Sequence, residues 1–146
     1  MNKRIYLIAA ILWMGLIFYM SNQPATVSAM QSGDLVSFLE KIPYIGATIT
    51  HLMNIGVGEF VIRKSAHMFL YFVLMILLYM SMYDDKKNIK QLMILSFIYT
   101  ALYACTDEIH QLFIEGRSGE IRDVMVDSTG ALLGGACIYI KHKISK

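Results

Sequence analysis

The chain has 146 residues, of which 56% are hydrophobic and only 16% are charged, and its mean hydropathy is +0.51. These values exclude an ordinary soluble domain and favour a single membrane domain over residues 1–146. The net charge of +2 says little by itself, and we expect no nucleic-acid partner.

Four apolar segments are long enough to cross a membrane, because a spanning helix needs roughly 20 residues. In chain order they cover about residues 5–20, 65–83, 91–113 and 124–140. The first segment is slightly short, but its ends can reach the interface or the bilayer can thin around it. The sequence therefore predicts an all-α fold, a four-helix transmembrane bundle.

The distribution of basic residues predicts the orientation, since cytoplasmic loops carry an excess of Lys and Arg. One set of span ends carries eight of the thirteen basic residues: Lys3, Arg4, Lys86, Lys87, Lys90, Lys141, Lys143 and Lys146. We expect this set to be cytoplasmic, so that the protein is a multi-pass protein of the cell membrane with both termini inside. The other set of span ends then faces outward.

The long outer connection, residues 21–62, is predicted to carry short interfacial helices. Pro24 ends the first span because it disfavours helical geometry at Gln23. An amphipathic helix with Ser32 as its cap follows from apolar residues at helical spacing, Leu35, Phe38, Leu39 and Ile42. It either lies flat on the outer leaflet or packs over the bundle as a lid. Residues 47–62 favour a second interfacial or re-entrant helix that leads into Arg63.

The second span opens with Arg63 and Lys64, and Arg63, His67 and Tyr71 follow at i, i+4 and i+8. They predict one polar stripe descending from the outer surface. Such a stripe faces the bundle interior or a wet cavity, because an ionisable side chain in lipid is costly. Tyr71 itself is predicted to be a packing residue with a hydrogen bond.

Polar residues also gather where the third span ends and the fourth begins. Asp107, Glu108, His110 and Gln111 lie near the end of the third span. A turn with two glycines holds Arg117 at its centre, and Arg122 follows. On the fourth span, Asp123 and Asp127 continue into Gly130 and Gly134 along one stripe, and the two glycines allow another backbone to approach closely.

These residues support three kinds of chemistry. The cations Arg63, Lys64, Arg117 and Arg122 could bind a phosphate or carboxylate at the membrane surface, together with Gln23, Gln111, Asp123 and Asp127. His67 or His110 could act as general acid or base, oriented by Asp107 or Glu108. Asp, His and Glu together could hold a divalent metal, but no tight motif such as His-Glu-x-x-His appears, so we expect neither a metal nor another cofactor. A polar network that only fixes the fold remains an alternative.

Several motifs taken together resemble the VanZ-like family of small bacterial membrane proteins. They are Phe18-Tyr19-Met20-Ser21-Asn22-Gln23, Arg63-Lys64-Ser65-Ala66-His67 with Tyr71, Asp107-Glu108-Ile109-His110-Gln111-Leu112-Phe113, Gly116-Arg117, Asp123, and Gly130 with Gly134. Relatives often carry proline where this chain has Glu115. The family pattern tolerates Asp or Asn at the position of Asp127, which argues against Asp127 as an indispensable base.

The resemblance implies a four-helix envelope protein, in a family named for a member linked to low-level resistance to the glycopeptide teicoplanin, and it supplies no settled activity. We expect an outward-facing polar pocket that binds an amphiphile: a lipid-linked wall precursor, a polyprenyl phosphate or a phospholipid. Two alternatives stay open, a membrane enzyme that hydrolyses or transfers a lipid headgroup and a structural accessory protein of a membrane complex. The sequence does not predict an oligomeric state.

Overall fold

The computed structural model describes residues 2–43 and 45–144. It contains six helices: α1 (Lys3–Ser21), α2 (Ala25–Leu39), α3 (Ile45–Asn54), α4 (Gly58–Met82), α5 (Ile89–Gln111) and α6 (Ile121–Ile144). No strand occurs in the described part of the chain, so the predicted all-α fold is confirmed.

Four of these helices, α1, α4, α5 and α6, are long and apolar enough to cross a membrane, which confirms the four predicted spans. Large apolar side chains such as Leu12, Leu102 and Leu132 are more than half exposed on them. Exposed apolar surface of this extent is costly in water and favourable in lipid. The spans therefore present to the bilayer the side chains that the bundle does not bury.

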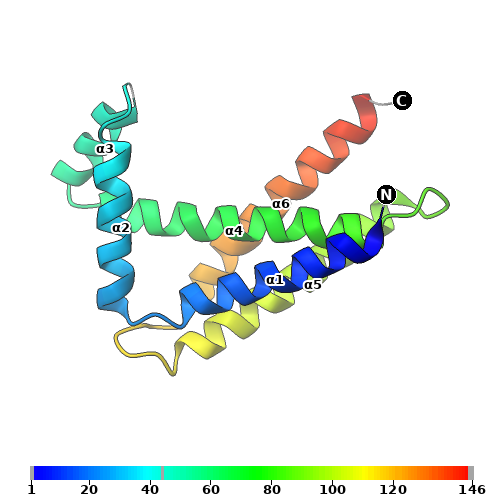
Figure 1. Ribbon diagram of the computed structural model, residues 1–146, viewed down its shortest axis with the longest axis horizontal. Helices are drawn as coiled ribbons and strands as arrows, with labels where there is room; N and C mark the ends of the chain where they lie inside the picture. The colour runs from blue at the N-terminus through cyan, green and yellow to red at the C-terminus, as the bar shows by residue number, and fades with distance from the viewer. Residues whose placement is uncertain (1, 44, 145–146) are drawn as a thin grey trace.

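The bundle is held together by an apolar core and by long-range hydrogen bonds. In Figure 1, α1, α4 and α5 lie alongside one another and α6 crosses α4, with which it makes the most extensive helix contact. Trp13 Nε1 donates to Leu70 O (2.8 Å) and the Tyr103 hydroxyl donates to Met14 O (2.6 Å), so that α1 is tied to both α4 and α5. The core between these helices consists of Ala10, Ile17, Leu70, Tyr71, Leu74 and Ala104.

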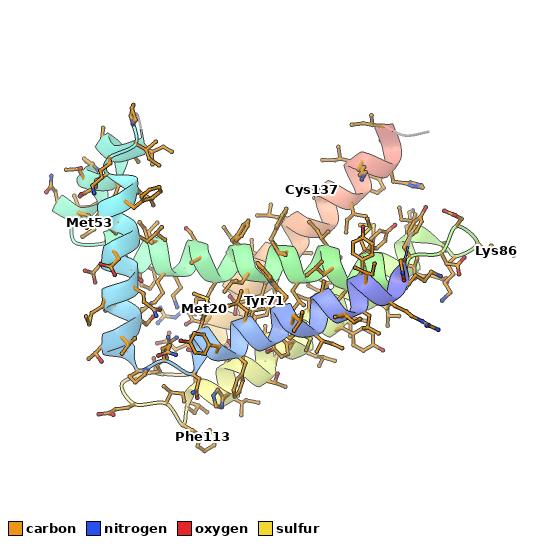
Figure 2. All side chains as sticks on the ribbon, viewed as in Figure 1. Met20, Met53, Tyr71, Lys86, Phe113 and Cys137 are labelled. Atoms are coloured by element: carbon orange, nitrogen blue, oxygen red, sulfur yellow. The ribbon has the colours of Figure 1, made fainter. Side chains whose placement is uncertain are left out.

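The two ends of the bundle differ in chemistry. The N-terminus, the α4–α5 connection and the end of α6 lie toward one side of the view in Figure 1. We call this the lysine-rich end because it gathers the predicted basic set, apart from Lys146, which lies outside the described residues. At the opposite, polar end, α1 passes into α2 and α5 passes into α6. Figure 2 labels Lys86 at the first end and Phe113 at the second.

Helix α2 runs across the polar end, where Val36 packs against Ile49 of α3 and Ile62 of α4. It begins at Ala25, directly after Pro24. Ser32 therefore lies inside the helix and donates to Ser28 O (3.0 Å), and its predicted role as a cap was wrong. The structure favours the lid arrangement over a helix that contacts only the leaflet.

The second helix predicted in this connection exists as α3, but it does not continue to Arg63 because Gly56 divides the segment. Gly56 has a φ of 77°, a conformation that residues with a Cβ rarely adopt. Val57 N donates to Leu52 O (3.1 Å) and Gly56 N to Met53 O (2.9 Å), the hydrogen bonds of a Schellman motif, which ends α3. Helix α4 begins at Gly58, seven residues before the predicted start at residue 65, so Arg63 and Lys64 lie within a helix.

Candidate functional site

Arg117 connects the α5–α6 loop to the end of α1. Nε donates to Gln23 O (2.9 Å), Nη2 donates to Met20 O (3.2 Å) and Nη1 donates to Gln111 Oε1 (3.2 Å). Met20 O is one of the last carbonyls of α1, which have no partner within their own helix. Three of the five guanidinium N–H groups are therefore used inside the protein, and Arg117 fixes the α1–α2 junction against α5.

A second arginine, Arg63, acts on the charge of Arg117. Burial and, secondarily, Arg63 lower the pKa of the Arg117 guanidinium from its usual value. A guanidinium stays protonated in spite of such a shift. Two arginines thus approach each other at the polar end, an arrangement that an anion would stabilise.

The two carboxylates at the end of α5 are buried and lie in the same network. Ser21 Oγ donates to Asp107 Oδ2 (2.7 Å), and Glu120 N donates to Glu108 Oε2 (3.0 Å). The Gln111 amide nitrogen donates to both acids, at 3.2 Å to Asp107 and 3.1 Å to Glu108. Because its oxygen accepts from Arg117, Gln111 joins the acids to the loop. These hydrogen bonds join α1, α5 and the α5–α6 loop.

A cavity of about 330 Å³ lies beside this network, between the first turns of α4 and α6 and the α5–α6 loop. Its volume is at the lower end of the range for small-molecule pockets, ~300–1,000 Å³. Eight of the twelve candidate residues line it: Arg63, Lys64, His67, Gln111, Arg117, Arg122, Asp123 and Asp127. A second cavity of about 80 Å³ lies under α2 and shares Arg63, His67 and Arg117 with the first.

The cavity contains both paired and unpaired charges. Lys64 of α4 forms an ion pair with Asp123 of α6, and Arg122 donates to Glu120 Oε2 (2.8 Å) from an exposed position. Arg63 has no ion-pair partner within residues 2–43 and 45–144. His67 has no side-chain hydrogen bond to any described residue, although the charges of Asp107, Arg117, Lys64 and Asp123 act on it. Arg63 and His67 are thus available to a ligand.

Asp127 lies at the buried side of the cavity, on α6. Its side chain is 1% exposed, and Oδ2 has no hydrogen-bond partner among the described residues. One turn further along, a Cβ at Gly130 would overlap the Met68 carbonyl, so α6 and α4 are in backbone contact there. Figure 2 labels Tyr71 inside the bundle, and its hydroxyl, like Asp107 Oδ1, also lacks a partner in the described part of the chain.

The remaining candidates lie outside the cavity. The His110 ring stacks on Phe18, with centroids 4.5 Å apart, and Nε2 lies 3.1 Å from Asn22 Oδ1. The Gln23 side chain donates to Tyr19 O (3.3 Å), and only its carbonyl belongs to the network. Asp107 and Glu108 are buried, hydrogen-bond to Gln111 and do not line the cavity. No three His, Cys, Asp or Glu side chains among the described residues are arranged to hold a metal ion.

Ser21 is a site residue that the sequence analysis did not single out, although its motif ends the first predicted span. Its hydroxyl satisfies Asp107 Oδ2 across 86 positions of sequence. The polar run after an apolar span was the available signal. Spacing along one helix does not reveal a partner on another helix.

The chain matches the VanZ/LLP1 family over residues 6–142, which is nearly its whole length. The chain belongs to the VanZ/LLP1 family. No curated protein and no solved structure matches it. Family membership and the four apolar helices together make it a multi-pass membrane protein, and the cavity lies within the part of the chain that the VanZ/LLP1 match covers.

Proposed function

We propose that the cavity at the polar end binds the headgroup of an envelope amphiphile: a lipid-linked wall precursor, a polyprenyl phosphate or a phospholipid. The observation that carries this proposal is Arg63, a cation that lines both cavities and has no ion-pair partner in the described part of the chain. A guanidinium binds a phosphate through two parallel hydrogen bonds. Lys64 and Arg122 line the same cavity, but each is paired with an acid, Asp123 and Glu120 respectively.

The proposed orientation places the lysine-rich end in the cytoplasm and the cavity at the outer face of the cell membrane. The excess of Lys and Arg at the N-terminus, the α4–α5 connection and the end of α6 supports it. A protein that occupies or shields an envelope lipid on that face would lower the access of a glycopeptide such as teicoplanin without any chemical step.

His67 supports an enzyme as a second candidate function. Its ring lines the cavity, lacks a side-chain hydrogen bond to described residues and experiences the charge of Asp123. A histidine beside a bound phosphate ester could act as general acid or base in hydrolysis or transfer of the headgroup. The role of Asp107, Glu108, Gln111 and Arg117 is to hold the cavity wall, because their hydrogen bonds are made within the protein.

The test is to purify the protein in mild detergent and to quantify copurifying lipids by mass spectrometry. We expect a phosphate-bearing lipid to copurify with the wild type and to be lost from Arg63→Gln. The matched control is Arg4→Gln, which removes an exposed arginine at the lysine-rich end. Equal lipid retention by all three proteins would refute the proposal.

A whole-cell comparison separates binding from catalysis. Cells that make the wild type or His67→Gln at equal membrane levels are compared for envelope lipids and wall precursors. Identical profiles, with lipid retention intact, support a binding protein. A species that appears or vanishes only with the wild type supports the enzyme.

A further inference from the structure

The acids of the cavity are not equivalent. Asp123 is paired with Lys64, and Glu120 accepts hydrogen bonds from Ser118 and Arg122. Asp127 alone among the three has an oxygen that is buried and without a donor from the described residues. Burying such a group costs free energy unless a partner is supplied.

The surroundings of Asp127 favour a cationic partner. Besides burial, Asp127 experiences the charges of three acids, Glu108, Asp107 and Asp123, and of one cation, Lys64. Lys64 is already paired with Asp123. A carboxylate surrounded by other acids is stabilised more by an ammonium than by a neutral hydroxyl.

Tyr71 does not supply the hydrogen-bond donor that Asp127 Oδ2 lacks. Three buried oxygens lack partners in the described part of the chain: Tyr71 Oη, Asp107 Oδ1 and Asp127 Oδ2. A phenol has a single O–H, so it can satisfy only one carboxylate oxygen. The charges of Asp107 and, less strongly, Asp127 act on the Tyr71 hydroxyl, and Asp107 does not line the cavity. Of these two acids without a full set of partners, Asp127 is therefore the one that lines the cavity.

Arg63 provides the opposite charge in the same cavity. Neither Arg63 nor Asp127 has an ion-pair partner among the described residues, and the two do not pair with each other. One cavity thus carries a free cation on α4 and a free acid on α6. A ligand that carries both a phosphate and an amine and fits this cavity would satisfy both.

We propose that the headgroup bound in this cavity is zwitterionic, with its phosphate at Arg63 and a primary ammonium at Asp127. This inference rests on the proposed function and narrows it to a class of ligand, of which phosphatidylethanolamine is the simplest lipid. A quaternary ammonium has no N–H to donate to Asp127 Oδ2. Phosphatidylglycerol offers hydroxyl donors without the positive charge.

The test uses the full-length protein and lipids with identical acyl chains. Native mass spectrometry measures which lipid is retained from equimolar mixtures of phosphatidylethanolamine with its monomethyl, dimethyl and trimethyl derivatives and with phosphatidylglycerol. We expect the wild type to retain phosphatidylethanolamine about tenfold over the trimethyl lipid, the ratio expected for one charged hydrogen bond. The largest fall should come with the third methyl group, which removes the last N–H.

Asp127→Asn should retain both lipids nearly equally, because the amide keeps the shape of the carboxylate and loses its charge. The matched control Asp85→Asn, at an exposed position in the α4–α5 connection, should behave as the wild type. The methylation series in the wild type needs no variant, so the proposal stays testable if Asp127→Asn fails to fold. Displacement by excess glycerophosphoethanolamine would indicate a soluble source of the same headgroup, and retention against it would indicate the lipid.

The possible failures are distinguishable. Equal retention of phosphatidylethanolamine and its trimethyl derivative, both lost with Arg63→Gln, would overturn the ammonium assignment and leave the proposed phosphate site intact. Preferred retention of phosphatidylglycerol would have the same meaning. Retention of every lipid by Arg63→Gln would instead contradict the proposed function itself.

Discussion

Replacement of Arg117 by lysine tests whether this arginine stabilises the fold or binds the ligand. Lysine keeps the charge but places its N–H groups on a single nitrogen, whereas the three contacts are made by three separate guanidinium nitrogens, so we expect only one of them to survive. At about 1 kcal/mol per hydrogen bond, loss of two costs about 2 kcal/mol of stability. For a chain of this size that corresponds to a fall of about 4–8 °C in the unfolding midpoint.

The assay records thermal unfolding in detergent and copurified lipid on the same preparation. We expect Arg117→Lys to lower the midpoint and to retain lipid below its new midpoint. Arg63→Gln should show the reverse, because Arg63 has no ion pair to lose within the described residues. An unchanged midpoint in Arg117→Lys, accompanied by loss of lipid, would show that the guanidinium serves the ligand and that the structural assignment is wrong.

Three further measurements test the bundle. Gly130→Ala should destabilise the protein by about 1–3 kcal/mol, because the added methyl group overlaps the backbone of α4. The control is Gly15→Ala, whose methyl group meets nothing within 4 Å and which should stabilise α1 slightly in the same thermal assay. Tyr103→Phe should cost about 1 kcal/mol, since it removes the donor to a carbonyl of α1; no change in midpoint would contradict that bond. The hydrogen bond from Lys3 lowers the pKa of Asp84. The small contribution of this ion pair to folding stability is therefore present above the pKa of Asp84 in the unfolded chain and is lost as the pH falls through its pKa in the folded protein. Asp84→Asn should abolish this pH dependence, and about 1 M salt should weaken the interaction because it is exposed.

The spans were predictable because hydropathy and length alone decide which helices can cross a membrane. The ends of the helices were less predictable. Residues 47–62 were predicted to form one helix across Gly56, because the residue type alone does not assign a positive φ. That positive φ ends α3 and lets α4 begin at Gly58. Likewise, Ser32 fitted a cap by type, yet α2 already begins at Ala25, seven residues upstream of it.

The sequence predicted which residues gather at the polar end, but it did not predict the hydrogen-bond partners of those residues. Arg117 lines the cavity as well, and three of its donors lie on the end of α1 and on Gln111, contacts that the sequence did not predict. Helical spacing shows which residues share a face, and it cannot show that Ser21 meets Asp107 from another helix. Partner choice depends on the rotation of each span, which only packing determines.

The glycine stripe of α6 connects the fold to the proposed chemistry. Gly130 and Gly134 lie against the Met68 and Phe72 carbonyls of α4, so the two backbones are close directly below Asp127. A larger residue at Gly130 would separate the two helices at the level where the free acid faces the cavity. The close contact of α4 with α6 therefore sets the spacing between the free cation and the free acid, and through it the size of the headgroup that can satisfy both.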